Sequence, residues 1–264
     1  MSFLAEIEAS TRARLRSLPG VRPPARVGSG TRPGERFVQA LRGRDRIDVI
    51  AEVKRRSPSR GALAPAADAL TQARRYVDCG AAAVSVLTEP TRFGGSFADL
   101  ERVAAGVEAP VLMKDFVLSP EQVRVAAGLG ASAFLLLLRL VDDVLAAELV
   151  AAGREYGIVA LLEAHDEREL ARARSLPGIL GINNRNLETL AIDRGLAAEL
   201  APLARGAPGA HGDRVVVAES GYTHPEHLRD VLGRVDAALI GSALMTTEDP
   251  QAFFRGVAEL EQTP

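Results

Sequence analysis

The chain has 264 residues, of which 47% are hydrophobic and 25% charged, which is enough for one large globular domain with an ample core. Its formal net charge of -2 argues against binding to nucleic acid or to a membrane surface through bulk charge. A single cysteine, Cys79, excludes an internal disulfide and a cysteine-based zinc site, and we expect a cytoplasmic protein.

Residues 1–46 predict an N-terminal extension that packs on the main body and is not a domain of its own. Apolar residues between positions 3 and 18 recur at helical spacing, which indicates an amphipathic helix. Residues 19–46 are rich in Pro, Arg and Gly, and a short helix is expected at 35–41. The most apolar run, at 131–138, is far shorter than the roughly 20 residues that span a bilayer, and no signal-peptide core is present. We therefore expect no membrane association.

From residue 47 onward, short apolar runs alternate with helical patterns. Strands are expected at 47–53, 82–87, 110–113, 132–138, 158–162, 178–182, 214–218 and 236–240. Helix start signals occur at Ser119, Asp166 and Thr223, each followed three residues later by an acid or an amide. Eight strand-then-helix units predict an α/β fold, a (β/α)8 TIM barrel over residues 47–264 that forms one domain with the extension. An open doubly wound sheet is the alternative, although it usually has fewer strands.

The expected strands end in polar residues, and in a parallel barrel these ends surround one mouth, where the chemistry of the fold takes place. The residues at six of these ends are Glu52 and Lys54, Lys114, Glu163, Asn183 and Arg185, Glu219 and Ser220, and Gly241 and Ser242. Any one of them could be a helix cap or an ion pair at the rim. Their shared position at the ends of successive units favours a functional mouth.

The charges at this mouth favour an anionic ligand. Two lysines and one arginine suit an anionic substrate, and the three glutamates can pair with those bases or take part in acid/base chemistry. Gly221 follows the seventh strand, and Gly241 and Ser242 follow the eighth. Phosphate-binding barrels present backbone N–H groups to a phosphate at these positions, although turns use the same residues freely.

Several segments together resemble the indole-3-glycerol-phosphate synthase family, and the resemblance covers nearly all of the chain. The segments that carry it are IAEVKRRSPSRG at 50–61, SVLTEPTRFGGSFADL at 85–100, LMKDFVLSPEQV at 112–123, LLEAH at 161–165, GINNRNLETL at 181–190, AESG at 218–221 and LIGSALM at 239–245. The order of so many motifs is highly specific, whereas no single one would be.

This resemblance implies a (β/α)8 barrel with an N-terminal helical extension and a decarboxylating carbon–carbon lyase of tryptophan biosynthesis. The implied reaction is ring closure, decarboxylation and dehydration of 1-(2-carboxyphenylamino)-1-deoxyribulose 5-phosphate to indole-3-glycerol phosphate. The partner is then a small anionic phosphorylated substrate. The family implies no metal and no organic cofactor, and we expect a monomer or a weak homo-oligomer.

The resemblance also implies roles for the charged residues of the mouth. Lys114 is similar to the general acid that protonates the ribulose carbonyl oxygen, and Glu163 to the glutamate that assists proton transfer and holds the lysine. Lys54 resembles the lysine that meets the anthranilate carboxylate, with Glu52 beside it. Glu219 is similar to the glutamate of the seventh strand.

The same resemblance implies substrate contacts. Asn183 and Arg185 are similar to a pair that orients the substrate. The implied substrate or phosphate contacts are Ser57, Ser220, Gly221, Gly241 and Ser242, and the implied aromatic flanks of the ring are Phe93 and Phe116.

Three alternatives remain open at this point. A paralogue in a secondary-metabolite pathway would carry the same residues. Another phosphate-binding barrel enzyme, such as phosphoribosylanthranilate isomerase, would need a cysteine or aspartate acid/base pair at strand ends, whereas Cys79 is expected at a helix end. A catalytically inactive barrel used for binding would have lost its polar mouth.

The sequence departs from the family pattern at a few positions. Glu89 stands where aspartate is expected, and Tyr222 stands where an aliphatic residue is usual. A Gly/Pro-rich stretch at 204–212, expected to form a mobile surface loop, looks longer than is typical. None of these departures removes an expected catalytic group.

Overall fold

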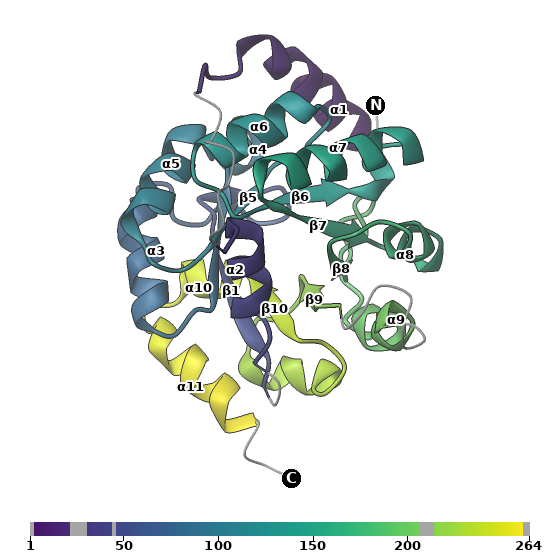
Figure 1. Cartoon of the computed structure of the whole chain (residues 1–264). Coiled ribbons are helices and arrows are strands. Elements are labelled where there is room, and N and C mark those ends of the chain that lie inside the picture. Colours follow the sequence, from purple (N-terminus) through teal and green to yellow (C-terminus); the bar gives the residue numbers. More distant parts are fainter. Residues whose placement is uncertain (1–2, 22–30, 44–45, 206–213, 261–264) are drawn as a thin grey trace.

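The computed structural model describes residues 3–21, 31–43, 46–205 and 214–260, and within them eight parallel strands close into a barrel (Figure 1). The strands are β1 (Asp48–Val53), β4 (Ala83–Leu87), β5 (Val111–Lys114), β6 (Ala133–Leu137), β7 (Val159–Ala164), β8 (Ile179–Asn183), β9 (Val216–Glu219) and β10 (Ala237–Ile240). Neighbours in the barrel follow chain order, and β1 pairs with β10 to close it. The (β/α)8 prediction is confirmed, and the open-sheet alternative is wrong.

Helices surround this barrel and connect its strands. The helical segments are α1 (Phe3–Arg14), η1 (Leu15–Ser17), α2 (Pro33–Ala40), α3 (Ala69–Asp78), α4 (Pro90–Phe93), α5 (Phe97–Gly106), α6 (Pro120–Gly128), η2 (Leu138–Leu140), α7 (Asp143–Tyr156), α8 (Glu167–Arg174), α9 (Gly195–Arg205), η3 (Pro225–Val231), α10 (Ser242–Thr246) and α11 (Pro250–Leu260). A short antiparallel hairpin of β2 (Arg56–Ser57) and β3 (Gly61–Ala62) follows β1. Among the described residues, no helix is long and apolar enough to cross a membrane.

Two of the three expected helix starts are present. Ser119 caps α6 by accepting the N–H of Glu121 at 3.2 Å, and Asp166 caps α8 by accepting the N–H of Glu169 at 2.8 Å. The prediction for Thr223 is wrong, because the segment is the 3-10 helix η3 and its N-cap position is His224. Of the stretch at 204–212, residues 206–212 lie outside the described residues.

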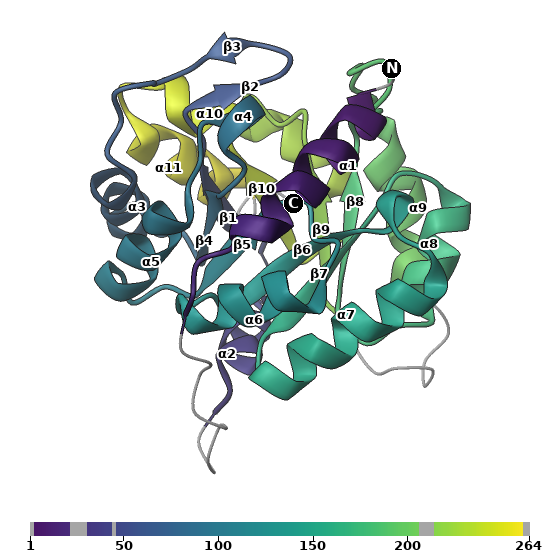
Figure 2. The ribbon, with the colours of Figure 1, turned by 90° about the horizontal axis from the view of Figure 1, so that it is seen from above.

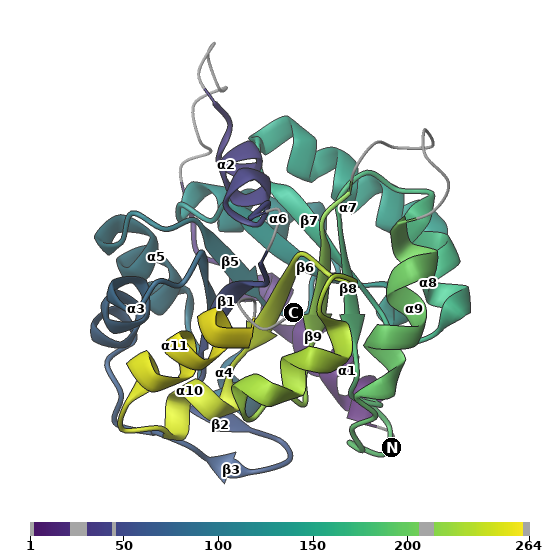
Figure 3. The ribbon, with the colours of Figure 1, turned by 90° about the horizontal axis from the view of Figure 1, so that it is seen from below.

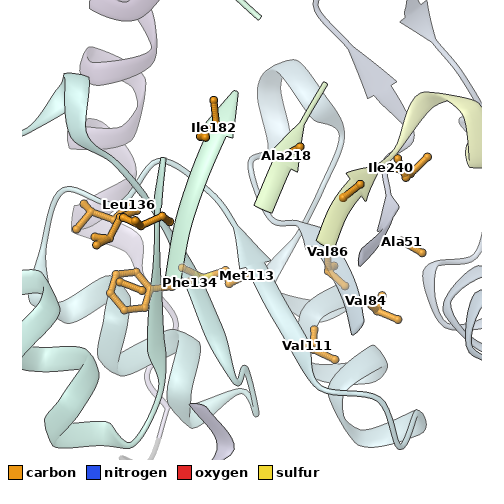
Figure 4. Close-up of a cluster of buried hydrophobic side chains, with 14 of the residues drawn as sticks. Ala51, Val84, Val86, Val111, Met113, Phe134, Leu136, Ile182, Ala218 and Ile240 are labelled. Atoms are coloured by element: carbon orange, nitrogen blue, oxygen red, sulfur yellow. The ribbon is translucent and has the colours of Figure 1, made fainter. Parts of the chain in front are cut away.

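The apolar core has an outer layer between strands and helices and an inner layer inside the barrel. Along β4, Val84 and Val86 belong to the outer layer, while Ala83 belongs to the inner one, as expected for side chains that alternate along a strand. Figure 4 shows Val84, Val86 and Val111 among the side chains of the outer layer. Because the strands are buried on both faces, they appear in the sequence as continuous apolar runs.

The N-terminal segment contacts both ends of the barrel. Figures 2 and 3 show α1 and the β2–β3 hairpin at one end and α2 at the other. Phe37 and Leu41 are fully buried in the inner layer, so α2 closes the end where the strands begin. Gly34 permits this close approach, because a Cβ there would lie 2.9 Å from the backbone nitrogen of Val159.

The helix α1 is anchored near the end where the strands finish. Ile7 packs with Phe116 and Leu137. Arg14 forms a bidentate contact with Asp115, with Nη2–Oδ1 at 2.8 Å and Nη1–Oδ2 at 3.1 Å. Asp115 directly follows β5, so this ion pair ties α1 to a strand end that carries Lys114.

Candidate active site

A cavity of about 410 Å³ opens at the carboxyl ends of the strands. Every site residue expected from the sequence lines it, which brings together side chains from segments far apart in the chain. These are Glu52, Lys54, Ser57, Phe93, Lys114, Phe116, Glu163, Asn183, Arg185, Glu219, Ser220, Gly221, Gly241 and Ser242. The expected polar mouth is therefore present, and both lysines reach the same cavity.

Lys114 lies between two buried carboxylates. Its Nζ is 3.1 Å from Oε2 of Glu163 and also forms an ion pair and a hydrogen bond with Oε2 of Glu219. The side chain of Lys114 is 13% exposed. Burial alone would lower the pKa of Lys114, but the charges of Glu219 and Glu163 outweigh burial and hold this pKa above its ordinary value. Lys114 is thus a protonated donor at neutral pH.

The two carboxylates have different surroundings. Glu163 Oε1 accepts a hydrogen bond from Nδ2 of Asn183 at 3.0 Å and lies 3.2 Å from Nε2 of His165. Oε1 of Glu219 has no hydrogen-bond partner among the described residues. Burial would raise the pKa of Glu163, but Lys114 and His165 hold it below the ordinary value. Burial and the neighbouring charge of Glu163 raise the pKa of Glu219, although Lys114 lowers it.

A second ion pair lies at the end of β1. Nζ of Lys54 is 2.6 Å from Oε1 of Glu52, as expected for residues two apart on one face of a strand. Gly241 backs this pair: a Cβ there would collide with Oε1 of Glu52 and lie 2.9 Å from Nζ of Lys54. The glycine after β10 therefore leaves space that the ion pair occupies.

The turn after β9 has an unusual backbone. Ser220 and Gly221 have positive φ angles of 66° and 93°, and the first is a conformation that a serine rarely adopts. Asn184 braces this turn, since its Nδ2 donates to the carbonyl of Ser220 at 3.0 Å and lies 3.1 Å from the hydroxyl of Tyr222. The departure at Tyr222 thus has a structural reason: its hydroxyl helps to hold Asn184.

One wall of the cavity is aromatic. The rings of Phe93 and Phe116 have centroids 6.2 Å apart at 45°. Phe3 of α1 lines the same cavity, a residue that the sequence interpretation missed because only the packing of α1 brings it there. This wall suits a flat aromatic group.

Arg185 supplies positive charge to the cavity. Its Nη1 donates to the carbonyl of Leu190 at 3.0 Å, and among the described residues it forms no ion pair. Burial and the charge of Arg60, another cavity residue, lower the pKa of Arg185. Two guanidinium groups near one cavity favour an anionic ligand.

Cys79, in contrast, lies at the end of α3 and is not part of the cavity wall. A cysteine acid/base role at the mouth is therefore wrong for this chain. Among the described residues, no group of three or more His, Cys, Asp or Glu side chains could hold a metal ion.

Comparison with known proteins places these features in context. A family model described as indole-3-glycerol phosphate synthase matches residues 6–257. The chain is 48% identical over 231 residues to a protein named indole-3-glycerol phosphate synthase from Deinococcus radiodurans, with 85% of each chain covered. It is 43% identical over 257 residues to one so named from Beutenbergia cavernae, with 95% of this chain and 93% of that one covered.

Solved structures show a more distant likeness. A phosphoribosylanthranilate isomerase from Thermotoga maritima aligns with a TM-score of 0.56 and 15% identity, covering 82% of this chain and 98% of that one. An identity this low shows a shared barrel fold and nothing about a shared reaction.

Proposed function

The chain belongs to the indole-3-glycerol phosphate synthase family, and on that premise we propose that the cavity at the strand ends is its active site. The enzyme is a decarboxylating lyase of tryptophan biosynthesis. Its reaction closes the pyrrole ring of 1-(2-carboxyphenylamino)-1-deoxyribulose 5-phosphate and yields indole-3-glycerol phosphate, carbon dioxide and water. The observation that carries the assignment of the site is the position of Lys114 between Glu163 and Glu219 inside the cavity.

Ring closure requires a strong electrophile. The attacking atom is an aromatic carbon, which is a poor nucleophile, so the ribulose carbonyl must be polarised or protonated as the new carbon–carbon bond forms. Lys114 donates a proton to that carbonyl oxygen, and Glu163 holds the ammonium in place. General acid catalysis of this kind contributes about 10²–10⁴-fold. Positioning and electrostatic stabilisation provide the remainder.

The pair of Lys54 and Glu52 acts at the anthranilate carboxylate and at the hydroxyl that leaves as water. The ammonium of Lys54 meets the anthranilate carboxylate before carbon dioxide leaves, and it can protonate the hydroxyl that departs as water in the later dehydration. Both lysines must reach one small substrate for this sequence of steps. Asn183, which bonds Glu163, and Arg185 orient the substrate between them.

We place the phosphate against the segments that follow β1, β9 and β10. The contacts proposed are Ser57, Ser220, Gly221, Gly241 and Ser242, which all line the cavity. The turn after β9 and the start of α10 line the cavity, and backbone N–H groups of such turns and helix starts are common ligands of a phosphate. Since the phosphate is remote from the reacting atoms, its binding energy can hold the substrate in a folded conformation. Phe93 and Phe116 flank the aromatic ring.

We further propose that the enzyme acts in the cytoplasm as a monomer or weak homo-oligomer, without nucleic acid. The formal net charge of -2 supports the last point, because nucleic-acid binding usually requires a strong positive excess. Sedimentation at micromolar concentration would distinguish this state from a tight oligomer.

A fluorescence assay tests the proposed activity. The purified protein is incubated with 1-(2-carboxyphenylamino)-1-deoxyribulose 5-phosphate, and the appearance of indole fluorescence is followed across a range of pH. We expect steady product formation, and no consumption of phosphoribosylanthranilate in a parallel reaction. Folded protein that forms no indole product at any pH would contradict the proposal.

A further inference from the structure

His165 lies two residues after Glu163 and is not used in the reaction described above. Its side chain is 3% exposed, and its ring lies between two carboxylates. Nδ1 is 3.0 Å from Oε2 of Glu169, and Nε2 is 3.2 Å from Oε1 of Glu163. The backbone N–H of His165 also donates to Oε2 of Glu169 at 2.8 Å. The imidazole therefore connects the glutamate that holds Lys114 to helix α8.

The surroundings favour the protonated form of this ring. A neutral imidazole has one N–H and one lone pair, so one of the two carboxylates would face a lone pair, whereas an imidazolium attracts both. Nε2 has no aligned hydrogen-bond partner among the described residues, so its attraction to Glu163 is mainly one of charge. Burial would lower the pKa of His165, but the two glutamates outweigh burial and raise it to about 9.

The charged groups around the ring come from several elements. On α8, Glu169 faces the ring directly, and it is held in turn by Nε of Arg139 from η2 at 2.6 Å. Asp166, the N-cap residue of α8, contacts the same arginine at 3.3 Å. Beyond Glu163 on the other side lies Lys114 of β5. Positive and negative groups thus alternate from the surface to the cavity, and removing the central positive charge would leave adjacent carboxylates facing each other.

This arrangement makes the two glutamates of the site unequal. Glu163 has positive or donor groups at Lys114, Asn183 and His165, while Glu219 has Lys114 and an unpartnered Oε1. A single proton shared between two neighbouring carboxylates resides on the one with less stabilisation of its charge. In this cavity that carboxylate is Glu219.

We propose that His165 is a positioning residue that, as an imidazolium, holds Glu163 ionised and directed toward Lys114, and so assigns the mobile proton of the site to Glu219. This inference rests on the proposed function. Lys114 gives a proton to the carbonyl oxygen, and the neutral carboxyl of Glu219 then gives its proton to Lys114 and becomes a carboxylate. A proton from solvent restores the neutral carboxyl of Glu219 before the next turnover. This is the one net proton that the overall conversion of the ionised substrate into product, carbon dioxide and water consumes.

Nuclear magnetic resonance tests the protonation state without any change at the site. The chain has four histidines, and substituting glutamine for His211, His224 and His227 leaves His165 as the one imidazole to observe. In protein labelled with ¹⁵N at histidine, we expect both ring nitrogens to remain protonated at pH 7 and to titrate near pH 9. A neutral ring at pH 7 would overturn the proposal whether or not the protein has synthase activity.

Two variants test the effect on the reaction. His165→Asn and His165→Gln both remove the charge, while the longer glutamine can still donate an N–H toward Glu163. In both we expect the acidic limb of the kcat profile to move up by about one pH unit or more, because the pKa of Glu163 rises when an adjacent opposite charge is lost. On this limb kcat then falls about tenfold, while KM changes less than about twofold.

The outcomes separate charge from structure. If His165→Gln keeps the wild-type pH profile, a hydrogen bond is sufficient and the charge proposal is wrong. His227→Gln, on η3, is the matched control and should leave the profile unchanged. If the wild-type enzyme forms no indole product, the proposed function fails, and the resonance titration still decides the state of His165.

Discussion

At the scale of single residues, Lys114 makes the sharpest prediction. Replacing it with alanine removes the proton donor and leaves the buried carboxylate of Glu163 without this cation. We expect kcat to fall by at least about 10²–10⁴-fold, while substrate still binds because the proposed phosphate contacts are separate. Indole fluorescence measures turnover, and calorimetry with unconverted substrate measures binding. Near-wild-type turnover would refute the general-acid assignment.

The variant Lys114→Arg provides the comparison for this prediction. It keeps the positive charge, but guanidinium is a poor proton donor and has a different shape. We expect it to fold and to remain inactive. Substantial activity in Lys114→Arg would mean that charge alone, without proton transfer, accounts for the role of this residue.

Gly241 makes a second prediction at this scale. A Cβ at this position would collide with the ends of Glu52 and Lys54, which are flexible side chains, so the fold can adapt while the ion pair must move. We expect Gly241→Ala to melt within a few degrees of wild type and to lose most of its kcat. Gly20→Ala is the control, since a Cβ at Gly20 meets nothing within 4 Å. Full activity in Gly241→Ala would show that the position of the pair is not critical.

His165 also predicts how stability depends on pH. Its pKa in the folded state is raised to about 9 by the two glutamates against the effect of burial, from an ordinary value of about 6.5. A raised pKa contributes stability that is fully present below about pH 6.5 and is lost as the pH rises through 9. The free energy of unfolding of wild type should exceed that of His165→Gln by a few kcal/mol at most near pH 6. Urea unfolding should show this difference shrink toward pH 9.5.

At the scale of elements, the strands could be predicted well because each one is buried on both faces. The predicted helix start at Thr223 is wrong for a different reason. Thr223 has the sequence signature of a helix cap, but its backbone N–H donates to Nδ1 of His227 at 3.3 Å and its hydroxyl lies 3.1 Å from Nδ1 of His224. These two imidazoles compete for the polar atoms that would otherwise cap a helix, and only the folded structure shows that they lie within reach. Likewise, the place of Phe3 in the cavity depends on where α1 packs, which periodicity does not specify.

The attachment of α1 can be tested through its ion pair with the strand end after β5. The side chain of Asp115 is fully buried, and Arg14 supplies its cation. Removing one partner of such a pair leaves an uncompensated charge, so Arg14→Met should lower the free energy of unfolding by about 3 kcal/mol. Hydrogen exchange should show α1 opening more readily. Arg14→Lys keeps the charge without the bidentate geometry, so its free energy of unfolding should lie between those of wild type and Arg14→Met. An unchanged stability in Arg14→Met would show that α1 is held by other contacts.

At the scale of the whole molecule, we propose that residues 1–46 and the barrel over 47–264 form one domain. Phe37 is buried in the inner core layer together with residues from most of the strands. We therefore expect α2 and the strands to unfold in a single transition. Phe37→Ala should lower the free energy of unfolding by about 3–5 kcal/mol. Native-state hydrogen exchange should give α2 and β7 similar opening free energies. A much lower value for α2 would indicate an independent appendage.

The closure of the barrel by α2 has a consequence for biosynthesis. Translation produces α1 and α2 before any strand, yet α2 packs on a layer that includes Leu239 of the last strand. While the nascent chain emerges from the ribosome, the inner layer on which the apolar face of α2 docks stays incomplete until that strand has been made. The helix α2 therefore cannot complete its packing until the final β-strand has been released, and its apolar face stays accessible to chaperones until then.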